Sequence, residues 1–335
     1  MRLPEWISAA SWAAFVVACA PTAATPARGG GLEAQLASIA AASGGTVSVT
    51  VLNLRSGERA SVGGQTLRPM MSVFKLPLAV ATLVDVDRGV LRLDQTVPIT
   101  ASELRRDGPI AEAWRRGDKA PSVRLMLTDM LRESDSTAGD KLVTLLGGGA
   151  SITARLRSLG LEGITIRGPE IVRDAALACV GEPAPDGGWT LDEIAACSTP
   201  DAAALAAAVR HEVDSPPDSA TTDGIVELLA RLDQATILTG DSRTWLLSTL
   251  AETRTGPTRL RGRLPSDARV AHKTGTGATA QGVTIAMGDV GIITPTNGDP
   301  FVIAVLMAGS RASVETQESI IARMARVSLD AFATK

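Results

Sequence analysis

The alternation of apolar and polar positions predicts strands near both ends of the chain. Residues 47–51 place valine at every second position, which is typical of a strand with one buried face. β-like patterns return later in the chain, at residues 270–276, 283–294 and 301–308. Asn297-Gly298, between the last two of these segments, predicts a hairpin turn.

Helical spacing marks the rest of the chain. Leu32, Leu36 and Ile39 repeat at helical intervals, and a final helix carries an apolar face around Ile320 and Met324. The middle is rich in Leu, Ala and Arg, and helices are predicted there at residues 123–131, 137–146, 202–209 and 224–232.

Strands at both ends with helices between them do not fit a doubly wound parallel sheet. They predict an α/β fold with an antiparallel sheet of about five strands, built from both termini and flanked by helices, plus an all-helical inserted subdomain. We expect the α/β domain to comprise residues 32–66 and 258–335, and the all-helical domain to comprise residues 67–257.

The first residues resemble an export signal. An apolar stretch at 7–20 follows Arg2 and is too short to span a membrane, so we interpret residues 1–20 as a signal peptide and 21–31 as a linker. Small residues around Cys19 offer a cleavage site, and the same segment resembles a bacterial lipoprotein signal that would lipidate Cys19. The alternative is an uncleaved anchor. We expect an exported, periplasmic protein, with lipid anchoring through Cys19 left open.

Composition excludes several other functions. The 335 residues are 45% hydrophobic and 21% charged, enough for a substantial core in one large domain or two intimate ones. A net charge of −3 and an aromatic content of 3% without any Tyr argue against nucleic-acid binding. Two His and three Cys are scattered along the chain, so no metal or other cofactor is expected. Nothing in the sequence specifies an oligomer, and we expect a monomer.

Removal of the signal leaves two cysteines, Cys179 and Cys197. An even count in an oxidising compartment predicts a disulfide between them. The alternative is two unrelated buried thiols.

Three short motifs could carry chemistry. Ser72 and Lys75 open an apolar helical run, and their spacing places the hydroxyl and the amine on one helix face. A lysine at this range can activate a serine nucleophile if burial and nearby cations lower its pKa. The alternative is a solvated helix start, although the apolar flanks of the motif argue for burial.

The second motif, Ser134-Asp135-Ser136, lies at a predicted elbow between two helices, where Asp135 or Ser136 could simply cap a helix. The third, Lys273-Thr274-Gly275-Thr276, lies on a predicted strand. Its lysine and hydroxyls suit a carboxylate, and glycine within a strand indicates that something approaches the backbone closely.

Together, in this order, the three motifs resemble those of the class A serine β-lactamases within the β-lactamase and penicillin-binding protein superfamily. The resemblance covers the chain from Leu32 to Lys335. It implies an active site at the junction of the two domains, in which Ser72 attacks the β-lactam carbonyl and forms an acyl-enzyme. Lys75 or a downstream glutamate would take the first proton, and Ser134 would pass a proton to the departing ring nitrogen.

The resemblance also implies the remaining roles. Glu170 lies 36 residues after Ser134, as in the family, and would activate the deacylating water. Backbone N–H groups of Ser72 and Thr276 would form the oxyanion hole. The substrate-binding residues implied by the resemblance are Ser136, Asp174, Arg259, Lys273, Thr274, Gly275 and Thr276, with Arg259 adding positive charge beside the substrate carboxylate.

Three departures from the family pattern stand out. Ser136 replaces the usual asparagine and lacks its pair of N–H donors, so recognition of the substrate amide would be weaker or mediated by water. Asp174 stands where asparagine is usual. The Ω loop, about residues 166–200, is longer than in most members and contains both cysteines, whereas the strand from Lys273 and its sequel resemble the extended-spectrum branch.

The expected function is therefore hydrolysis of penicillins and cephalosporins, small-molecule substrates whose degradation gives antibiotic resistance. A D,D-peptidase or penicillin-binding protein would share all three motifs but gives Glu170 no required role. A non-catalytic exported binding protein on the same fold is the other alternative.

Overall fold

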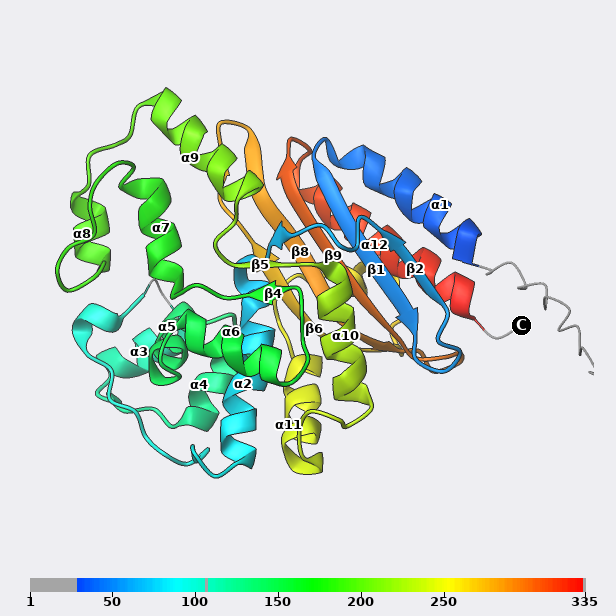
Figure 1. The fold of residues 1–335 in the computed structure, drawn as a ribbon, viewed down its shortest axis with the longest axis horizontal. Coiled ribbons are helices and arrows are strands. Elements are labelled where there is room, and N and C mark those ends of the chain that lie inside the picture. The colour runs from blue at the N-terminus through cyan, green and yellow to red at the C-terminus, as the bar shows by residue number, and fades with distance from the viewer. Residues whose placement is uncertain (1–28, 106–107, 334–335) are drawn as a thin grey trace, which may run out of the picture.

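The computed structural model describes residues 29–105 and 108–333. Its centre is an antiparallel sheet in the order β2-β1-β9-β8-β6, with a short β7 paired to β8 (Figure 1). These strands are β1 (Thr46–Asn53), β2 (Arg59–Val62), β6 (Arg269–Thr276), β7 (Thr279–Ala280), β8 (Val283–Thr294) and β9 (Phe301–Ser310). Both ends of the chain therefore supply the sheet, as the apolar pattern predicts.

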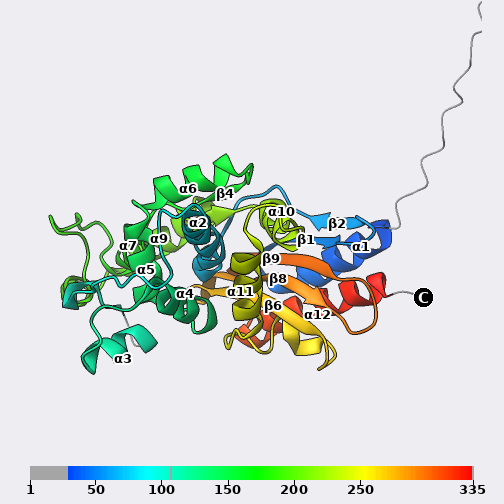
Figure 2. The same ribbon diagram turned by 90° about the horizontal axis from the view of Figure 1, so that it is seen from below.

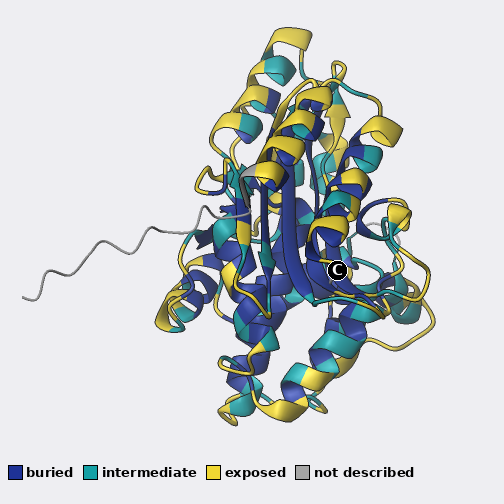
Figure 3. Ribbon diagram, turned by 90° about the vertical axis from the view of Figure 1, so that its right-hand side faces the viewer, coloured by how far each residue is buried: buried dark blue, intermediate teal, exposed yellow. Residues whose placement is uncertain are grey.

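The sheet is buried on both faces. Along β9, Phe301, Ile303 and Val305 contribute to one apolar core, while the alternate residues Val302 and Ala304 contribute to a second core. This separation follows from the two-residue period of a strand, which sends neighbouring side chains to opposite faces. Figure 3 shows these buried strands at the centre, with exposed positions on the outer helices.

Helices cover the two faces. The N-terminal helix α1 (Gly29–Ala40) and the C-terminal helix α12 (Val314–Phe332) lie side by side on one face (Figures 1 and 2). The opposite face is covered by α10 (Thr222–Asp233) and α11 (Gly240–Ala251).

A helical region lies beside the sheet around α2 (Lys75–Asp87), as Figure 2 shows. Residues 75–85 of this helix are buried. The other helices of the region are α3 (Pro109–Arg115), α4 (Val123–Arg132), α5 (Ser136–Leu145), α6 (Gly149–Ser158), α7 (Glu170–Ala178), α8 (Leu191–Ala196) and α9 (Ala202–Asp214). A small second sheet, ordered β3-β5-β4, joins this region to the segment before α2 through β3 (Arg68–Pro69), β4 (Ile164–Thr165) and β5 (Ser219–Ala220).

The predicted fold class is confirmed, and the four helices predicted in the middle correspond to α4, α5, α9 and α10. Asn297-Gly298 lies in the turn between β8 and β9, where Gly298 has a φ of 121°. One boundary is wrong: the linker was expected to reach residue 31, but α1 already begins at Gly29. The first turn of a helix precedes its first buried residue, so the apolar spacing that starts at Leu32 places the helix start too late.

The predicted signal peptide and most of the linker lie outside the described residues. Within residues 29–105 and 108–333, no helix is both long enough and apolar enough to cross a membrane.

Candidate active site

Ser72 lies in a tight turn that leads directly into α2. The turn is a 3₁₀ segment, Met71–Phe74, and Met71 has a φ of 45°, a left-handed conformation that is strained for a side chain of this size. The turn is held by hydrogen bonds from Val73 N to Met70 O (3.0 Å) and from Met70 N to Asp218 O (3.0 Å). The nucleophile candidate is thus presented by strained but well-anchored backbone.

Lys75 begins α2 and is completely buried. Its Nζ donates hydrogen bonds to Ser72 Oγ (3.2 Å) and Ser134 O (2.6 Å) and forms an ion pair with Glu170 Oε2 (2.7 Å). A buried ammonium is costly unless it is paired and hydrogen-bonded, and here both conditions are met. The predicted spacing of Ser72 and Lys75 on one face is confirmed.

The elbow before α5 performs two tasks at once. Asp135 is the N-cap of α5, where its carboxylate accepts a hydrogen bond from Ala138 N (2.8 Å), so the capping interpretation is correct for this residue. Ser134, with a φ of 62°, instead directs its hydroxyl between the two lysines: its Oγ lies 3.4 Å from Lys75 Nζ and 3.0 Å from Lys273 Nζ. Ser136 Oγ lies 3.5 Å from Lys75 Nζ.

Glu170 is the first residue of α7 and is 5% exposed. Its Oε1 accepts hydrogen bonds from Ser72 Oγ (3.1 Å) and Arg173 Nη2 (3.1 Å). Burial alone would raise the pKa of Glu170, but the charges of Lys75 and Arg173 outweigh burial and lower it to about 2. The carboxylate is therefore ionised throughout the neutral range.

Lys273 lies on β6 and is fully buried. Its Nζ donates hydrogen bonds to Ser134 Oγ (3.0 Å) and Thr274 O (2.9 Å). Burial and the nearby charge of Lys75 lower the pKa of Lys273 to about 7, so its charge depends on pH near neutrality.

The rest of the third motif packs against Ser72 and Arg259. A Cβ added to Gly275 would lie 2.4 Å from Met70 O, so only glycine lets β6 approach the turn that holds Ser72. Arg259, 5% exposed, donates hydrogen bonds to Thr276 Oγ1 (2.8 Å) and Gly275 O (3.1 Å). The hydroxyl of Thr274 is hydrogen-bonded to that of Thr255 (2.6 Å). Asp174 lies one turn after Glu170 on α7 and is half-buried. Burial would lower the pKa of Arg173, but the charges of Glu170, Asp218 and Asp174 raise it.

Cys179 and Cys197 form the predicted disulfide, and the alternative of two unrelated thiols is wrong. The bond connects the residue after α7 to the residue after α8. It therefore closes the segment that follows Glu170.

Two further residues contact Glu170 and were not identified from the sequence. Asp140 on α5 accepts hydrogen bonds from the backbone N–H of Glu170 (2.5 Å) and Ile171 (3.3 Å), which fixes the start of α7. Arg173 contacts the Glu170 carboxylate directly. Its spacing of three residues from Glu170 is a signal only once α7 is known to be a helix. Asp140 has no local signal, since it meets α7 only in the folded chain.

Within the described part of the chain, no group of three or more His, Cys, Asp or Glu side chains is arranged to hold a metal ion.

Comparisons with known proteins agree with this geometry. Residues 31–332 match the model of the beta-lactamase enzyme family. Extended-spectrum beta-lactamase PER-1 of Pseudomonas aeruginosa is 31% identical over 297 residues, which cover 88% of this chain and 85% of PER-1. Beta-lactamase VEB-1 of the same organism is 26% identical, with 91% of each chain covered.

A solved structure, that of a beta-lactamase from Chitinophaga pinensis, aligns with a TM-score of 0.74 and 30% identity and covers 90% of this chain and 99% of that one. A family match over nearly the whole chain, together with a relative above 30% identity, shows that this chain belongs to the beta-lactamase enzyme family.

Proposed function

We propose that this protein is a class A serine β-lactamase that hydrolyses the β-lactam amide of penicillins and cephalosporins through an acyl-enzyme on Ser72. One observation carries the proposal: Ser72 Oγ is within hydrogen-bonding distance of both Lys75 Nζ (3.2 Å) and Glu170 Oε1 (3.1 Å). A serine hydroxyl is a weak nucleophile until a neighbouring group takes its proton, and here two candidate bases lie beside it.

In the acylation step, Ser72 Oγ attacks the lactam carbonyl and transfers its proton to Glu170, or to Lys75 after Lys75 has passed its own proton to Glu170 Oε2 (2.7 Å). Both contacts are short enough, so the geometry supports either base. The backbone N–H groups of Ser72 and Thr276 would stabilise the oxyanion. The close packing of Gly275 on the Ser72 turn supports this pairing, because it draws the end of β6 toward the nucleophile.

Ser134 would carry a proton to the departing ring nitrogen. Its hydroxyl lies between Lys75 and Lys273, at 3.4 and 3.0 Å from the two amines, so it can receive a proton on one side while it donates on the other. Opening of the ring leaves an ester on Ser72 and an amine on the product.

The substrate carboxylate would bind to Lys273 and to the hydroxyls of Thr274 and Thr276. Arg259 supports this site, because its guanidinium holds Thr276 Oγ1 (2.8 Å) while its Nε pairs with Glu318 (3.2 Å). We assign Gly275 to the same site, because it allows β6 to approach the turn that holds Ser72. We assign Ser136 to the side of the site that faces the substrate amide.

Glu170 would then activate the water that hydrolyses the ester, with Asp174 one turn further along the same helix. This step separates a lactamase from a penicillin-binding D,D-peptidase, which has no required role for such a glutamate. The direct contact of Glu170 with Ser72 favours the lactamase over that alternative and over a non-catalytic binding protein.

The remaining parts of the proposal concern the whole chain. We place the site between an α/β domain of residues 32–66 and 258–335 and a helical domain of residues 67–257, and we assign the Ω loop to about 166–200. The long segment after Glu170 supports assignment to the extended-spectrum branch, to which PER-1 belongs by name. The apolar residues 7–20 support export to the periplasm, and mass spectrometry of the mature N-terminus will decide whether Cys19 is lipidated. We expect a monomer, because nothing in the sequence specifies an oligomer.

The test is hydrolysis of a chromogenic cephalosporin by the purified mature protein, with Ser72→Ala as the matched control. We expect multiple turnovers by the wild type and none by the variant. Stoichiometric acylation without turnover would instead indicate a penicillin-binding protein, and no acylation at all would indicate a binding protein.

A further inference from the structure

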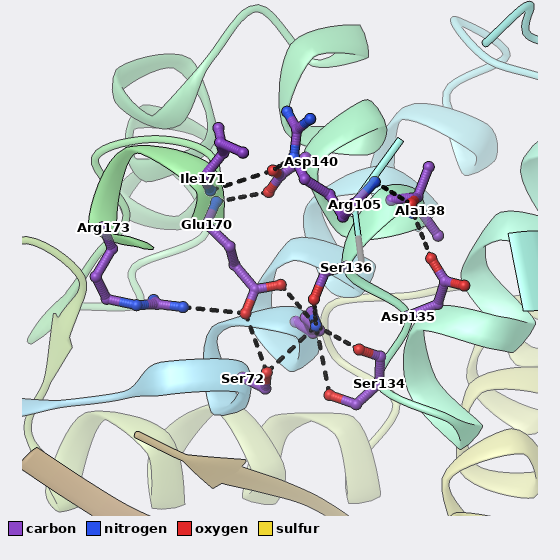
Figure 4. Close-up of polar contacts among 12 residues, drawn as sticks. Ser72, Arg105, Ser134, Asp135, Ser136, Ala138, Asp140, Glu170, Ile171 and Arg173 are labelled. Carbon is purple, nitrogen blue, oxygen red and sulfur yellow. Dashed lines mark hydrogen bonds and ion pairs between the residues drawn. The ribbon is translucent and has the colours of Figure 1, made fainter. Parts of the chain in front are cut away.

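Arg173 is buried beside Glu170, one helical turn after it on α7. Its Nη2 lies 3.1 Å from Glu170 Oε1, and its side chain is 10% exposed. Oε1 is also the oxygen that faces Ser72, whereas Oε2 pairs with Lys75 at 2.7 Å. Each oxygen of the Glu170 carboxylate is therefore held by its own cation (Figure 4).

We infer that Arg173 is a positioning residue for deacylation, which holds Glu170 Oε1 in place and keeps the carboxylate ionised after Ser72 has been acylated. The inference rests on the proposed function and adds to it a residue that acts through Glu170 rather than on the substrate.

The need for such a residue follows from the chemistry of the acyl-enzyme. In the free enzyme, Ser72 Oγ donates a hydrogen bond to Glu170 Oε1. Once Ser72 is esterified, its oxygen has no proton to donate, and the guanidinium of Arg173 continues to hold Oε1. The terminal torsion of a glutamate has a broad energy profile, so a carboxylate held at one oxygen can rotate. Catalysis is sensitive to misplacement of a base by about 1 Å, so a second contact matters.

Arg173 is itself held by acidic groups on its other side. Its Nη1 lies 3.6 Å from Asp218 Oδ2. Asp218 in turn accepts hydrogen bonds from Arg167 N (2.7 Å) through its side chain and from Met70 N (3.0 Å) through its carbonyl. Glu212 of α9 is 3% exposed, and burial raises its pKa although the charge of Arg173 acts in the opposite direction. The guanidinium therefore lies between the Glu170 carboxylate and Asp218.

The proposal predicts a specific dependence on pH. The titratable groups that face this pair or its immediate neighbours are Lys75 of α2, Asp140 of α5, Asp174 of α7, His211 and Glu212 of α9, Asp218 before β5, and Lys273 of β6. Removal of Arg173 takes away a positive charge that balances the negative charges of the acidic residues in this set. The pKa of Glu170 then rises, and a base that must be ionised fails at a higher pH than before.

The experiment follows the decay of the Ser72 acyl adduct by mass spectrometry between pH 2 and 8 in the wild type, Arg173→Gln and Arg173→Lys, a range that includes the wild-type Glu170 pKa of about 2. In Arg173→Gln we expect the acid limb of the deacylation rate to move upward by about one pH unit. Arg173→Lys keeps the positive charge, so its acid limb should lie close to that of the wild type. The inference would be overturned if the deacylation rate of folded Arg173→Gln fell at the same acidic pH as that of the wild type.

Asp218→Asn is the matched control, and it keeps the test informative even if Arg173→Gln does not fold. It weakens the anchor of Arg173 but removes a negative charge near Glu170, so we expect the acid limb to stay or to move to lower pH. Asp218→Asn keeps the charge of Arg173, so an acid limb that moves upward as far as in Arg173→Gln would mean that lost packing rather than lost charge causes the shift, and would contradict the inference. Failure of the proposed function has a different signature, since no adduct would form on Ser72 of the wild type.

Discussion

Ser72 Oγ donates a hydrogen bond of 3.1 Å to Glu170 Oε1, although the two residues are 98 positions apart in the chain. The contact depends on the β3-β5-β4 sheet, which joins the segment before Ser72 to the segment before Glu170. It also depends on Asp140, which holds the N–H of Glu170 at 2.5 Å. The nucleophile and the proposed deacylation base thus meet on backbone that is fixed from both sides.

Replacement of Glu170 by glutamine tests this relationship. The amide keeps the size of the side chain but cannot take a proton from water, so we expect deacylation to slow by about 10²- to 10⁴-fold. Mass spectrometry of the Glu170→Gln variant mixed with a penicillin should detect a persistent adduct on Ser72. Continued turnover without any adduct would contradict the assigned roles.

Lys273 gives a prediction about substrate binding and pH. Its pKa of about 7 means that the ammonium is charged below neutrality and loses its proton as the pH rises above 7. We expect the KM for a penicillin to rise between pH 6 and 8.5 in the wild type. In Lys273→Ala the KM should be higher by about 10- to 100-fold at pH 6, since a charge-assisted hydrogen bond contributes about 1.5–3 kcal/mol. It should also vary less with pH, and an unchanged KM would count against the carboxylate site.

The parts of the site that the sequence reveals are those with local spacing. Ser72 and Lys75 lie one helical turn apart, so their shared face follows from the sequence alone. The meeting of Ser134 with Lys273 joins an elbow to a distant strand, and only the family resemblance predicted it. In the fold, β9 is apolar at nearly every position, so its pattern predicts a strand but not which residues face which core. The contact between Arg173 and Glu170 could not be predicted, because it requires the start of α7 to be known.

Gly275 gives a prediction about packing. The Cβ of an alanine at this position would lie 2.4 Å from Met70 O and 3.0 Å from Val73 N, both backbone atoms of the Ser72 turn. We expect Gly275→Ala to lower the free energy of unfolding by about 1–3 kcal/mol and to reduce kcat/KM by displacing Ser72. Gly240→Ala is the control, because no atom lies within 4 Å of a Cβ added at the start of α11. Thermal unfolding and activity that are equal in the two variants would contradict the prediction.

Ser136 gives the last prediction, which concerns specificity. Its hydroxyl lies 3.5 Å from Lys75 Nζ, where the resembling family has an asparagine that binds both this lysine and the substrate amide. A serine is shorter and has a single O–H donor, so it cannot donate to the substrate amide in the way that asparagine does.

We therefore expect Ser136→Asn to improve kcat/KM for benzylpenicillin, which carries an acylamide side chain, by about 3- to 10-fold, because one neutral hydrogen bond contributes about 0.5–1.5 kcal/mol. The matched control is 6-aminopenicillanic acid, which lacks that amide and should show no improvement. Parallel assays of the two penicillins with the wild type and with Ser136→Asn distinguish an effect through the substrate amide from an effect through Lys75. An equal gain on both would mean that the new asparagine acts through Lys75 rather than through the substrate, because Lys75 is common to both reactions and the amide is not.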